Sequence, residues 1–436
     1  MQFKLTKKEK SWILYDVGNS AFVLMVSTIL PVYFNYLAQN AGVSDVDYLA
    51  YWGYAASIST LIVAVLGPVM GTLADTRGFK KPLFLSCILV GCAGCLLMGL
   101  TTWWISFLVI FIIAKVGFHS SLVFYDSMLS DVTTPERMDR VSSFGYAWGY
   151  AGSCIPFVVS LVFVLGYQKM GLSFETGMMI AFAVVAVWWL VMSLSLMKQY
   201  RQVHYVERKS HAMRESVGRI IETLRSVRKQ KKIFLFLIAF FFFIDGVYTI
   251  IDMATAYGSA LGLDSTGLLL ALLVTQFVAF PFSILFGRLA EKYDTGKLIL
   301  TCIAAYTGIT VFAVFMKAQW QFWVLAIFVG MFQGGIQALS RSYFAKIVPP
   351  ERSGEYFGLM DICGKGASFM GTTVVGLASQ AFGSINIGVS AIVFLFLAGA
   401  LFFMKTEHSG SESMKNQENI VMGQQMFHLS LIHISE

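Results

Sequence analysis

Long hydrophobic stretches separated by short polar segments run through the chain from residue 11 to residue 404. Each contains about 20 or more residues, the length that an α-helix rising ~1.5 Å per residue needs to cross a lipid bilayer. The stretches are continuous and do not alternate between apolar and polar positions, so they exclude a membrane β-barrel. The pattern predicts an all-α membrane protein with about 12 transmembrane helices.

The predicted spans form two sets of six, separated by a polar segment. The lysines before the first span suggest a signal peptide, but this span is too long, contains Asp16 and lacks a small-residue cleavage site. We therefore expect a retained helix. The spans are residues 11–38, 50–70, 82–101, 103–129, 141–166 and 175–197, then 233–257, 266–287, 297–316, 320–345, 355–380 and 385–404.

Composition and charge agree with a membrane protein. Charged residues make up 13% of the chain, against about 25% in soluble domains. Nearly all of the 32 Lys and Arg residues lie on the side of the N-terminus; the exceptions are Lys169 and Lys317 in opposite loops, and Lys115 and Lys365 within spans. By the positive-inside rule, both termini are expected to be cytoplasmic in a bacterial-type plasma membrane. The net charge of +7 then requires no nucleic-acid partner.

Two loop motifs recur in the second half of the chain at nearly constant spacing. Residues 71–75 (Gly-Thr-Leu-Ala-Asp) match residues 287–291 (Gly-Arg-Leu-Ala-Glu), 216 positions later. Residues 135–137 (Pro-Glu-Arg) match residues 350–352, 215 positions later. Two six-helix halves in the same orientation are parallel repeats, related by an axis along the membrane normal, which places a substrate site at their interface.

These repeats divide the chain into four parts: two six-helix bundles at residues 1–197 and 233–405, a linker at residues 198–232 and a tail at residues 406–436. The linker is basic and has an apolar stripe at helical spacing, which predicts an amphipathic helix on anionic lipid or, alternatively, a basic connector. The tail is polar and unpatterned, so we expect it to be disordered. Its last ten residues resemble translated adapter sequence and are assigned no function.

The loop after the second span resembles a known signature. Residues 71–81 (Gly-Thr-Leu-Ala-Asp-Thr-Arg-Gly-Phe-Lys-Lys) are similar to the loop signature of the major facilitator superfamily. Glycines allow close approach of helices, and an acid beside cations can hold or release helix ends, so the signature implies a gate. Thr76 and Phe79 stand where the family usually has cations and Arg77 is displaced by one position, so the charge network is expected to differ in detail.

Longer strings resemble one family within this superfamily. They are residues 12–22 (Trp-Ile-Leu-Tyr-Asp-Val-Gly-Asn-Ser-Ala-Phe), 333–342 (Gln-Gly-Gly-Ile-Gln-Ala-Leu-Ser-Arg-Ser) and 358–365 (Gly-Leu-Met-Asp-Ile-Cys-Gly-Lys). Together they are similar to the vacuole-effluxer permeases, whose fungal members are autophagy-related amino-acid exporters. The resemblance covers about residues 10–405 and implies the two-bundle fold and amino-acid efflux.

Polar and ionisable residues inside the predicted spans are the candidates for binding substrate or a coupling ion. A charge at mid-bilayer costs on the order of 3 kcal/mol, so each one requires a partner or a function. The candidates are Asp16, Asn19, Lys115, His119, Asp245, Asp252, Gln333, Gln337, Asp361 and Lys365.

Two pairs of these candidates are four residues apart and so share a helical face: Lys115 with His119, and Asp361 with Lys365. Both faces are expected to point inward. For Asp361 and Lys365, a self-neutralising ion pair within the helix is an equally good interpretation.

Lys115 has no acid at helical spacing within its own span, which favours a position facing the cavity. There it could attract a substrate carboxylate or pair with Asp16 or Asp245 across helices. The buried acids or His119 could also exchange protons, because burial and neighbouring charges shift their titration. The sequence leaves open which group would do so.

Asp126 and Arg341 occupy equivalent positions in the two repeats, 215 residues apart, with opposite charge. We interpret them as gate residues near the inner mouth. The complete set of predicted gate residues is Gly71, Asp75, Arg77, Gly78, Asp126, Arg137, Glu291, Arg341 and Arg352.

The sequence therefore predicts a monomeric secondary transporter of a small polar organic solute, with amino acids favoured and proton coupling as an option. A drug exporter, a sugar carrier and a non-transporting sensor remain alternatives. A membrane enzyme is disfavoured, because of the six histidines only His119 lies within a span. The sequence lacks a nucleotide-binding Walker motif, and no metal or other cofactor is expected. The expected partners are the substrate, protons and membrane lipids.

Overall fold

The computed structural model describes residues 3–207, 225, 227–384 and 386–409. Its N-terminal half consists of α1 (Lys7–Asn40), α2 (Asp45–Ala74), α3 (Lys80–Leu100), α4 (Trp104–Ser127), α6 (Met138–Gly166) and α7 (Phe174–Gln199). Its C-terminal half consists of α9 (Lys231–Ala260), α10 (Ser265–Leu289), α11 (Thr295–Val314), α12 (Gln319–Ile347), α13 (Ser353–Phe382) and a last helix, Asn386–Ser409. Short helices are α5 (Leu129–Val132), η1 (Gln168–Met170) and η2 (Pro350–Arg352).

The expected membrane fold is confirmed. Among the described residues, 11 helices are long and apolar enough to cross a membrane. The 30-residue α13 occupies the place of the remaining predicted span and is also long enough. No strand forms in the described part of the chain, where one isolated bridge joins Thr76 to Val206.

Helix boundaries follow side-chain caps that the hydrophobic pattern alone does not reveal. Thr6 and Glu9 form a capping box at the start of α1, with Thr6 Oγ1 accepting from Glu9 N and Glu9 Oε2 accepting from Thr6 N. Ser44, Ser173 and Asp264 similarly cap α2, α7 and α10. These contacts satisfy backbone donors that a helix start leaves unpaired, and they extend several helices beyond the predicted spans.

Two predictions about the segments outside the bundles have different outcomes. The amphipathic stripe expected in the linker lies largely in residues 208–224, outside the described residues. The tail was expected to begin at residue 406, but the last helix continues to Ser409. The remainder of the tail is outside the described residues.

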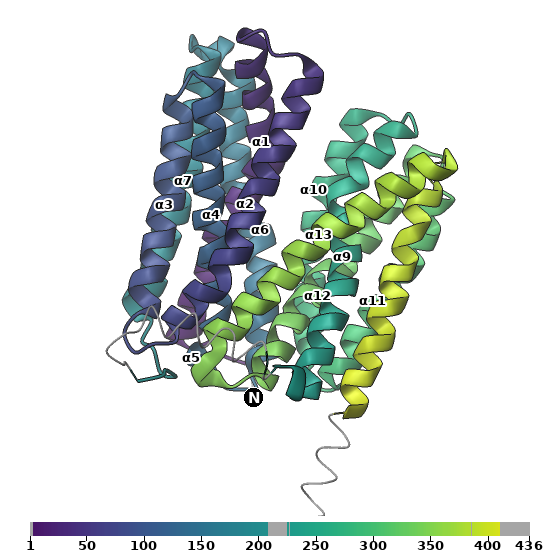
Figure 1. Cartoon of the computed structure of the whole chain (residues 1–436). Helices are drawn as coiled ribbons and strands as arrows, with labels where there is room; N and C mark the ends of the chain where they lie inside the picture. The colour runs from purple at the N-terminus through teal and green to yellow at the C-terminus, as the bar shows by residue number, and fades with distance from the viewer. Residues whose placement is uncertain (1–2, 208–224, 226, 385, 410–436) are drawn as a thin grey trace, which may run out of the picture.

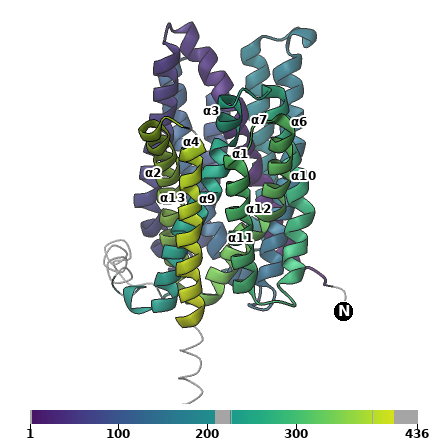
Figure 2. The same ribbon diagram turned by 90° about the vertical axis from the view of Figure 1, so that its right-hand side faces the viewer.

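The two halves converge at one end and diverge at the other (Figure 1). We call the end that holds the N-terminus the lower end; the last helix also finishes there. Between the halves, α2 packs against α13 and α6 against α10, with further contacts from α4 to α13 and from α6 to α12. Figure 2 shows the side of the molecule formed by the C-terminal half, with its helices running along the same axis as those behind them.

Each half has its own aromatic core. In the N-terminal half, Phe22 packs against Phe118 and Trp189; in the C-terminal half, Phe236 packs against Phe344 and Phe403. Large apolar side chains remain exposed on the outer surface, as expected for a protein surrounded by lipid. Examples are Leu61, Leu165 and Phe394, at 68%, 77% and 72% exposure.

Candidate functional site

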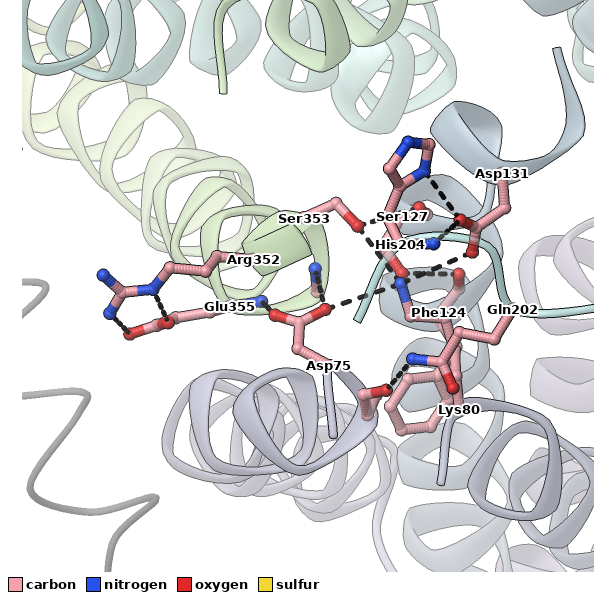
Figure 3. Close-up of polar contacts among 12 residues, drawn as sticks. Asp75, Lys80, Phe124, Ser127, Asp131, Gln202, His204, Arg352, Ser353 and Glu355 are labelled. Atoms are coloured by element: carbon pink, nitrogen blue, oxygen red, sulfur yellow. Dashed lines mark hydrogen bonds and ion pairs between the residues drawn. The ribbon is translucent and has the colours of Figure 1, made fainter. Parts of the chain in front are cut away.

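Asp75 joins the two halves at the lower end. It follows the last residue of α2, and its side chain is fully buried. Its Oδ1 accepts from Gly354 N at 2.8 Å and its Oδ2 from Glu355 N at 2.9 Å (Figure 3). Both N–H groups belong to the first turn of α13, where they lack helical acceptors and the helix dipole favours a negative charge. Asp75 therefore holds the start of α13 against the N-terminal half.

Two pairs of glycines allow α2 and α13 to approach this closely. A Cβ added at Gly354 would lie 2.6 Å from Gly71 O, and one added at Gly358 would lie 2.9 Å from Gly67 O. Both distances are shorter than real Cβ contacts. Larger residues at these positions would separate the helices and lengthen the hydrogen bonds from Asp75.

Lys80 brings a buried positive charge to the same contact. Its Nζ lies 3.5 Å from Asp75 Oδ1 and 4.0 Å from Asp131 Oδ2, and donates to Ser353 Oγ at 3.1 Å. Ser353 Oγ in turn donates to the Ser127 carbonyl at 3.0 Å. Burial raises the pKa of Asp75 to about 6, although Lys80 and the two amides act in the opposite direction. The buried charges of Asp75, Lys80 and Asp131 thus compensate one another within the N-terminal half, and Asp75 and Lys80 also bond to the first turn of α13 in the other half.

Asp131, on the short helix α5, accepts several hydrogen bonds from the first residues of the linker. Its Oδ2 accepts from Tyr200 Oη at 2.5 Å, and its Oδ1 accepts from the backbone N–H groups of Val203 (3.2 Å) and His204 (2.8 Å). His204 Nδ1 lies 3.0 Å from the same oxygen. Burial alone would raise the pKa of Asp131, but the bond from His204, the charge of Lys80 and the bond from Tyr200 lower it. The pKa of His204 is raised by its hydrogen bond to Asp131.

The same part of the linker binds the signature loop. We call residues 200–207 the linker strap. Gly78 has a φ of 81°, which glycine adopts readily, and this allows the signature loop to turn beside the strap. Four bonds that involve backbone atoms of the loop join it to the strap: Gln202 Nε2 donates to Ala74 O (3.0 Å), Gly78 N to Gln202 Oε1 (2.9 Å), Val206 N to Asp75 O (2.7 Å) and Arg77 N to Val206 O (3.1 Å). A fifth bond runs between side chains, from Arg77 Nη1 to Glu207 Oε1 (3.4 Å).

Arg341, on α12, makes a second contact between the halves. Its buried guanidinium donates through Nη1 to Asp126 Oδ1 at 3.0 Å, through Nε to Ser142 Oγ at 2.9 Å and through Nη2 to Ser142 O at 3.0 Å. Asp16 Oδ2 lies 3.6 Å from Nη2. Only a guanidinium offers several donors in a fixed plane, which is why arginine suits this position.

Aromatic rings enclose this guanidinium. The Arg341 Cζ lies 4.6 Å from the centroid of Trp12 and 4.4 Å from that of Tyr146. Cation–π contact of this kind is most favourable where water is excluded. Residues of the N-terminal half therefore surround the Arg341 guanidinium on several sides.

A third contact between the halves lies where α6 begins. Asp139 Oδ1 accepts from Ser342 Oγ at 2.6 Å, and its Oδ2 accepts from Thr295 Oγ1 at 2.8 Å and from Lys346. The neighbouring Arg140 forms an ion pair with the predicted gate residue Glu291. Polar contacts between the halves extend from the lower loops to mid-helix, where Tyr150 Oη donates to Gln337 Oε1 at 3.5 Å.

Charged candidates gather where α4 meets α13. Asp361 and Lys365 form an ion pair within α13, and Lys115 and His119 lie on α4, which packs against α13. Lys115 interacts electrostatically with Lys365 and with Asp252 of α9. We call Lys115, Asp252, Asp361 and Lys365 the charged centre: Lys365 pairs with Asp361 of its own helix, and Lys115 of the other half has Asp252 as its acidic neighbour.

Comparison with known proteins identifies the family. A family model described as "Vacuole effluxer Atg22 like" matches residues 5–136 and 130–414. The chain belongs to this family. The predicted resemblance is thereby confirmed.

Similar proteins occur in bacteria and in fungi. The "Uncharacterized MFS-type transporter YxiO" of Bacillus subtilis (strain 168) is 39% identical over 96% of this chain and 99% of its own length. "Autophagy-related protein 22-2" of Aspergillus clavatus is 25% identical over 60% of this chain and 46% of its own length. The chain thus matches about half the length of that fungal relative. These relationships identify the present chain as an integral membrane transporter of the major facilitator superfamily (MFS) type.

Solved structures support the fold alone, because their sequences are distant. The human organic anion transporter MFSD10 has a TM-score of 0.67 at 12% identity, covering 92% of this chain and 100% of its own. A bacterial homologue of the iron transporter ferroportin, in an outward-facing state, has a TM-score of 0.67 at 13% identity, covering 92% and 98%. The Atg22-like chain therefore has the major facilitator fold.

In this Atg22-like structure, the predicted gate residues separate into two groups. Gly71, Asp75, Asp126, Glu291 and Arg341 make contacts between the halves. Arg77 and Gly78 contact the strap, Arg137 pairs with Glu9 in its own half, and Arg352, at the end of η2, pairs with Glu355 in the first turn of α13.

The predicted substrate and coupling residues lie in different environments. Asp16 has Arg341 as its ionic neighbour, whereas the sequence suggests Lys115 for this role. Asn19 Nδ2 also donates to Asp16 Oδ1 at 3.5 Å. Asp245 lies in the core of the C-terminal half. Gln333 is buried on α12, one turn above Gln337.

Sequence reasoning missed several residues of the lower contacts. Their common feature is a position in a loop or at a helix end, where the partner is distant in sequence. Lys80 was noticed only as part of the signature, whereas a clustering of polar residues after the fourth span could have directed attention to Asp131. The missed residues are Lys80, Ser127, Asp131, Asp139, Ser142, Tyr200, Gln202, His204, Lys346 and Ser353.

Proposed function

We propose that this chain is a secondary active transporter that moves amino acids or related small polar solutes by alternating access. The observation that supports it best is the distribution of contacts between the halves. The two halves are bonded from the lower loops to mid-helix and diverge above that level (Figure 1). Such an arrangement suits a transporter whose gate is closed at one end.

The lower end is proposed to be the cytoplasmic side. The N-terminal segment, with Lys4, Lys7, Lys8 and Lys10, and the linker strap both belong to this end, and positively charged segments favour the cytoplasm. The structure would then correspond to an outward-facing state in a bacterial plasma membrane. Rocking of the halves would open the lower end and close the upper one.

The charged centre is proposed to bind the substrate. Lys115 and Lys365 come from opposite halves, and the second of them already has Asp361 as its partner. A solute carrying both a carboxylate and an ammonium group could exchange partners with these side chains, taking Lys115 for its carboxylate and Asp361 for its ammonium group. This supports an amino acid over an apolar drug or a neutral sugar.

The experiment uses purified protein in proteoliposomes loaded with a mixture of unlabelled amino acids. We expect counterflow of radiolabelled amino acids in the wild type and a loss of affinity in Lys115→Met. A lost charged hydrogen bond of about 1.5–3 kcal/mol corresponds to roughly ten- to hundredfold weaker binding. Lys169→Met, which changes an exposed lysine at the upper end, serves as the matched control.

Several outcomes would contradict the proposal. Counterflow of sugars without counterflow of amino acids would exclude this substrate class. Amino-acid binding without any exchange would indicate a sensor. Equal affinities in Lys115→Met and Lys169→Met would exclude Lys115 from the substrate site.

A further inference from the structure

Asp245 is a buried acid in the middle of α9 with an unusual set of partners. Its side chain has 0% exposure. Oδ1 accepts from the backbone N–H of Gly371 on α13 at 2.9 Å and from Thr249 Oγ1 at 3.3 Å. Oδ2 is also buried and has no hydrogen-bond partner. One oxygen of this carboxyl group is therefore bonded and the other is not.

No positive charge compensates this carboxyl group within the described part of the chain. The groups that face it are the Gly371 amide from α13 and Thr249 from its own helix, and the ion pairs of the C-terminal half involve other acids. Phe396 of the last helix packs beside the adjacent Gly246. By contrast, Asp16 lies near Arg341, and Asp361 pairs with Lys365.

An isolated carboxylate in such surroundings is far more costly than a neutral carboxylic acid, so the group takes up a proton. A proton on Oδ2 fits the observed contacts, because Oδ1 can continue to accept both hydrogen bonds. The lone unpaired oxygen is then a hydroxyl group, whose burial costs much less than that of a charge.

Gly371 connects this acid to the gate. A Cβ at Gly371 would lie 2.9 Å from Asp245 Cγ and still closer to Oδ1 and Thr249 Oγ1, so glycine is required for the contact. A side chain that competes for a helical N–H is a known cause of helix bending. The same helix starts at the Asp75 contact and includes Asp361 and Lys365. A change at Asp245 can thus act on α13, which reaches both the gate and the charged centre.

We propose that Asp245 binds and releases the coupling proton, and that its bond to Gly371 transmits this change to α13. The inference rests on the proposed function and assigns a residue to its proton coupling. In the state with the lower end closed, Asp245 Oδ2 holds the proton. When α13 moves and water reaches the carboxyl group, the O–H bond breaks, the proton passes to water, and the solvated carboxylate remains.

The first test does not depend on a substrate. Infrared difference spectra of the purified protein, between mildly acidic and mildly alkaline buffer, record the carbonyl band of protonated carboxyl groups. We expect Asp245→Asn to remove one component of this band. Asp47→Asn, which changes an exposed acid near the start of α2, should retain the complete wild-type band. An unchanged band in Asp245→Asn would overturn the proposal.

The second test uses the amino-acid mixture in proteoliposomes. Asp245→Asn should retain counterflow but lose accumulation driven by a pH gradient, to the level of protein-free liposomes. Accumulation equal to wild type would overturn the assignment. If Asp245→Asn fails to fold, Asp245→Glu provides the alternative: it should show a shifted infrared component and retain accumulation, and an unshifted band would refute the role. If the wild type transports no amino acid, the proposed function fails, while the infrared result still decides the role of Asp245.

Discussion

Single residues determine how closely the two halves can approach at the lower end. Asp75 accepts two backbone N–H groups from α13, a contact that requires the helices to be separated by little more than their backbones. Gly71 and Gly354 make this possible because neither has a side chain. The hydrogen bonds of Asp75 therefore depend on the two glycines, although the glycine positions contribute no side chain to the contact.

Gly71→Ala should weaken the closed gate, because its Cβ would overlap the backbone of Gly354. Gly376→Ala, at a position in α13 with nothing within 4 Å, is the matched control. Relief of glycine's helix penalty should stabilise that control by roughly 0.5–1 kcal/mol. Thermal unfolding in detergent should therefore show a lower midpoint for Gly71→Ala and an equal or higher one for Gly376→Ala. The reverse order would contradict the close-contact explanation.

Arg341→Lys should alter the transport rate or the preferred state while leaving substrate affinity nearly intact. A lysine cannot reproduce the three hydrogen bonds to Asp126 and Ser142. Breaking a buried ionic contact costs about 3–5 kcal/mol. Rate and affinity can be separated in counterflow assays, with the exposed Arg288→Lys as control. A large loss of affinity at a normal rate would instead make Arg341 a ligand.

At the scale of elements, the linker strap is bound directly to the gate. Asp131, Gln202 and Val206 connect it to α5, to the end of α2 and to the signature loop. A linker is usually considered a passive connection between bundles. Here its first residues share the acid Asp131 with Lys80, which itself contacts the first turn of α13.

The strap should make the closed gate sensitive to pH. The His204 pKa is raised above 6.5, so its contact contributes stability that is complete below 6.5 and lost as the pH rises through the raised value. The Asp75 pKa is raised from 3.8 to about 6 and acts in the same direction, with its contribution lost as the pH rises through about 6. The lowered pKa of Asp131 matters only below its ordinary value of 3.8. The lower end should therefore open more readily as the pH rises from 3.8 to about 6, through Asp75, and again as it rises above 6.5, through His204.

Spin labels at Glu136→Cys and Lys292→Cys, two exposed lower positions in opposite halves, would measure this opening on a background without native cysteines. The distance distribution should broaden as the pH rises, and His204→Ala should reduce this dependence. Val203→Ala, at the neighbouring exposed position, should leave it unchanged. A distribution that is independent of pH would refute the role assigned to the strap.

Hydrophobic patterning predicted the helices well because each span must satisfy its own backbone within lipid. The spacing of the repeats also placed Asp126 and Arg341 at equivalent positions, and these residues bond directly. Partners such as Ser142 and Asp131 could not be predicted in this way. Their roles depend on which loop folds against which helix end, and a polar residue in a loop has no periodic signal. A repeated motif can also mislead: residues 135–137 match residues 350–352, which suggests a gate role for Arg137, but Arg137 pairs with Glu9 of its own half.

At the scale of the whole molecule, polar contacts at one end and separation at the other are what the proposed alternating access expects of one of its two states. Asp75, Arg341 and Asp139 contribute separate contacts, all within the lower part of the interface. Helices α2 and α13 on one side, and α6 and α10 on the other, are related by the repeat and provide surfaces on which the halves can rock. In the proposed alternating access, opening the lower end separates the partners of all three contacts.

Paired distance measurements at both ends of the reconstituted protein test this account most directly. One pair uses the lower positions 136 and 292, and the other uses Trp103→Cys and Lys317→Cys, which are exposed at the upper end in opposite halves. When the amino-acid mixture is added, the lower distance should increase in the same population of molecules in which the upper distance decreases. Distances that both remain fixed, or that both increase together, would contradict alternating access.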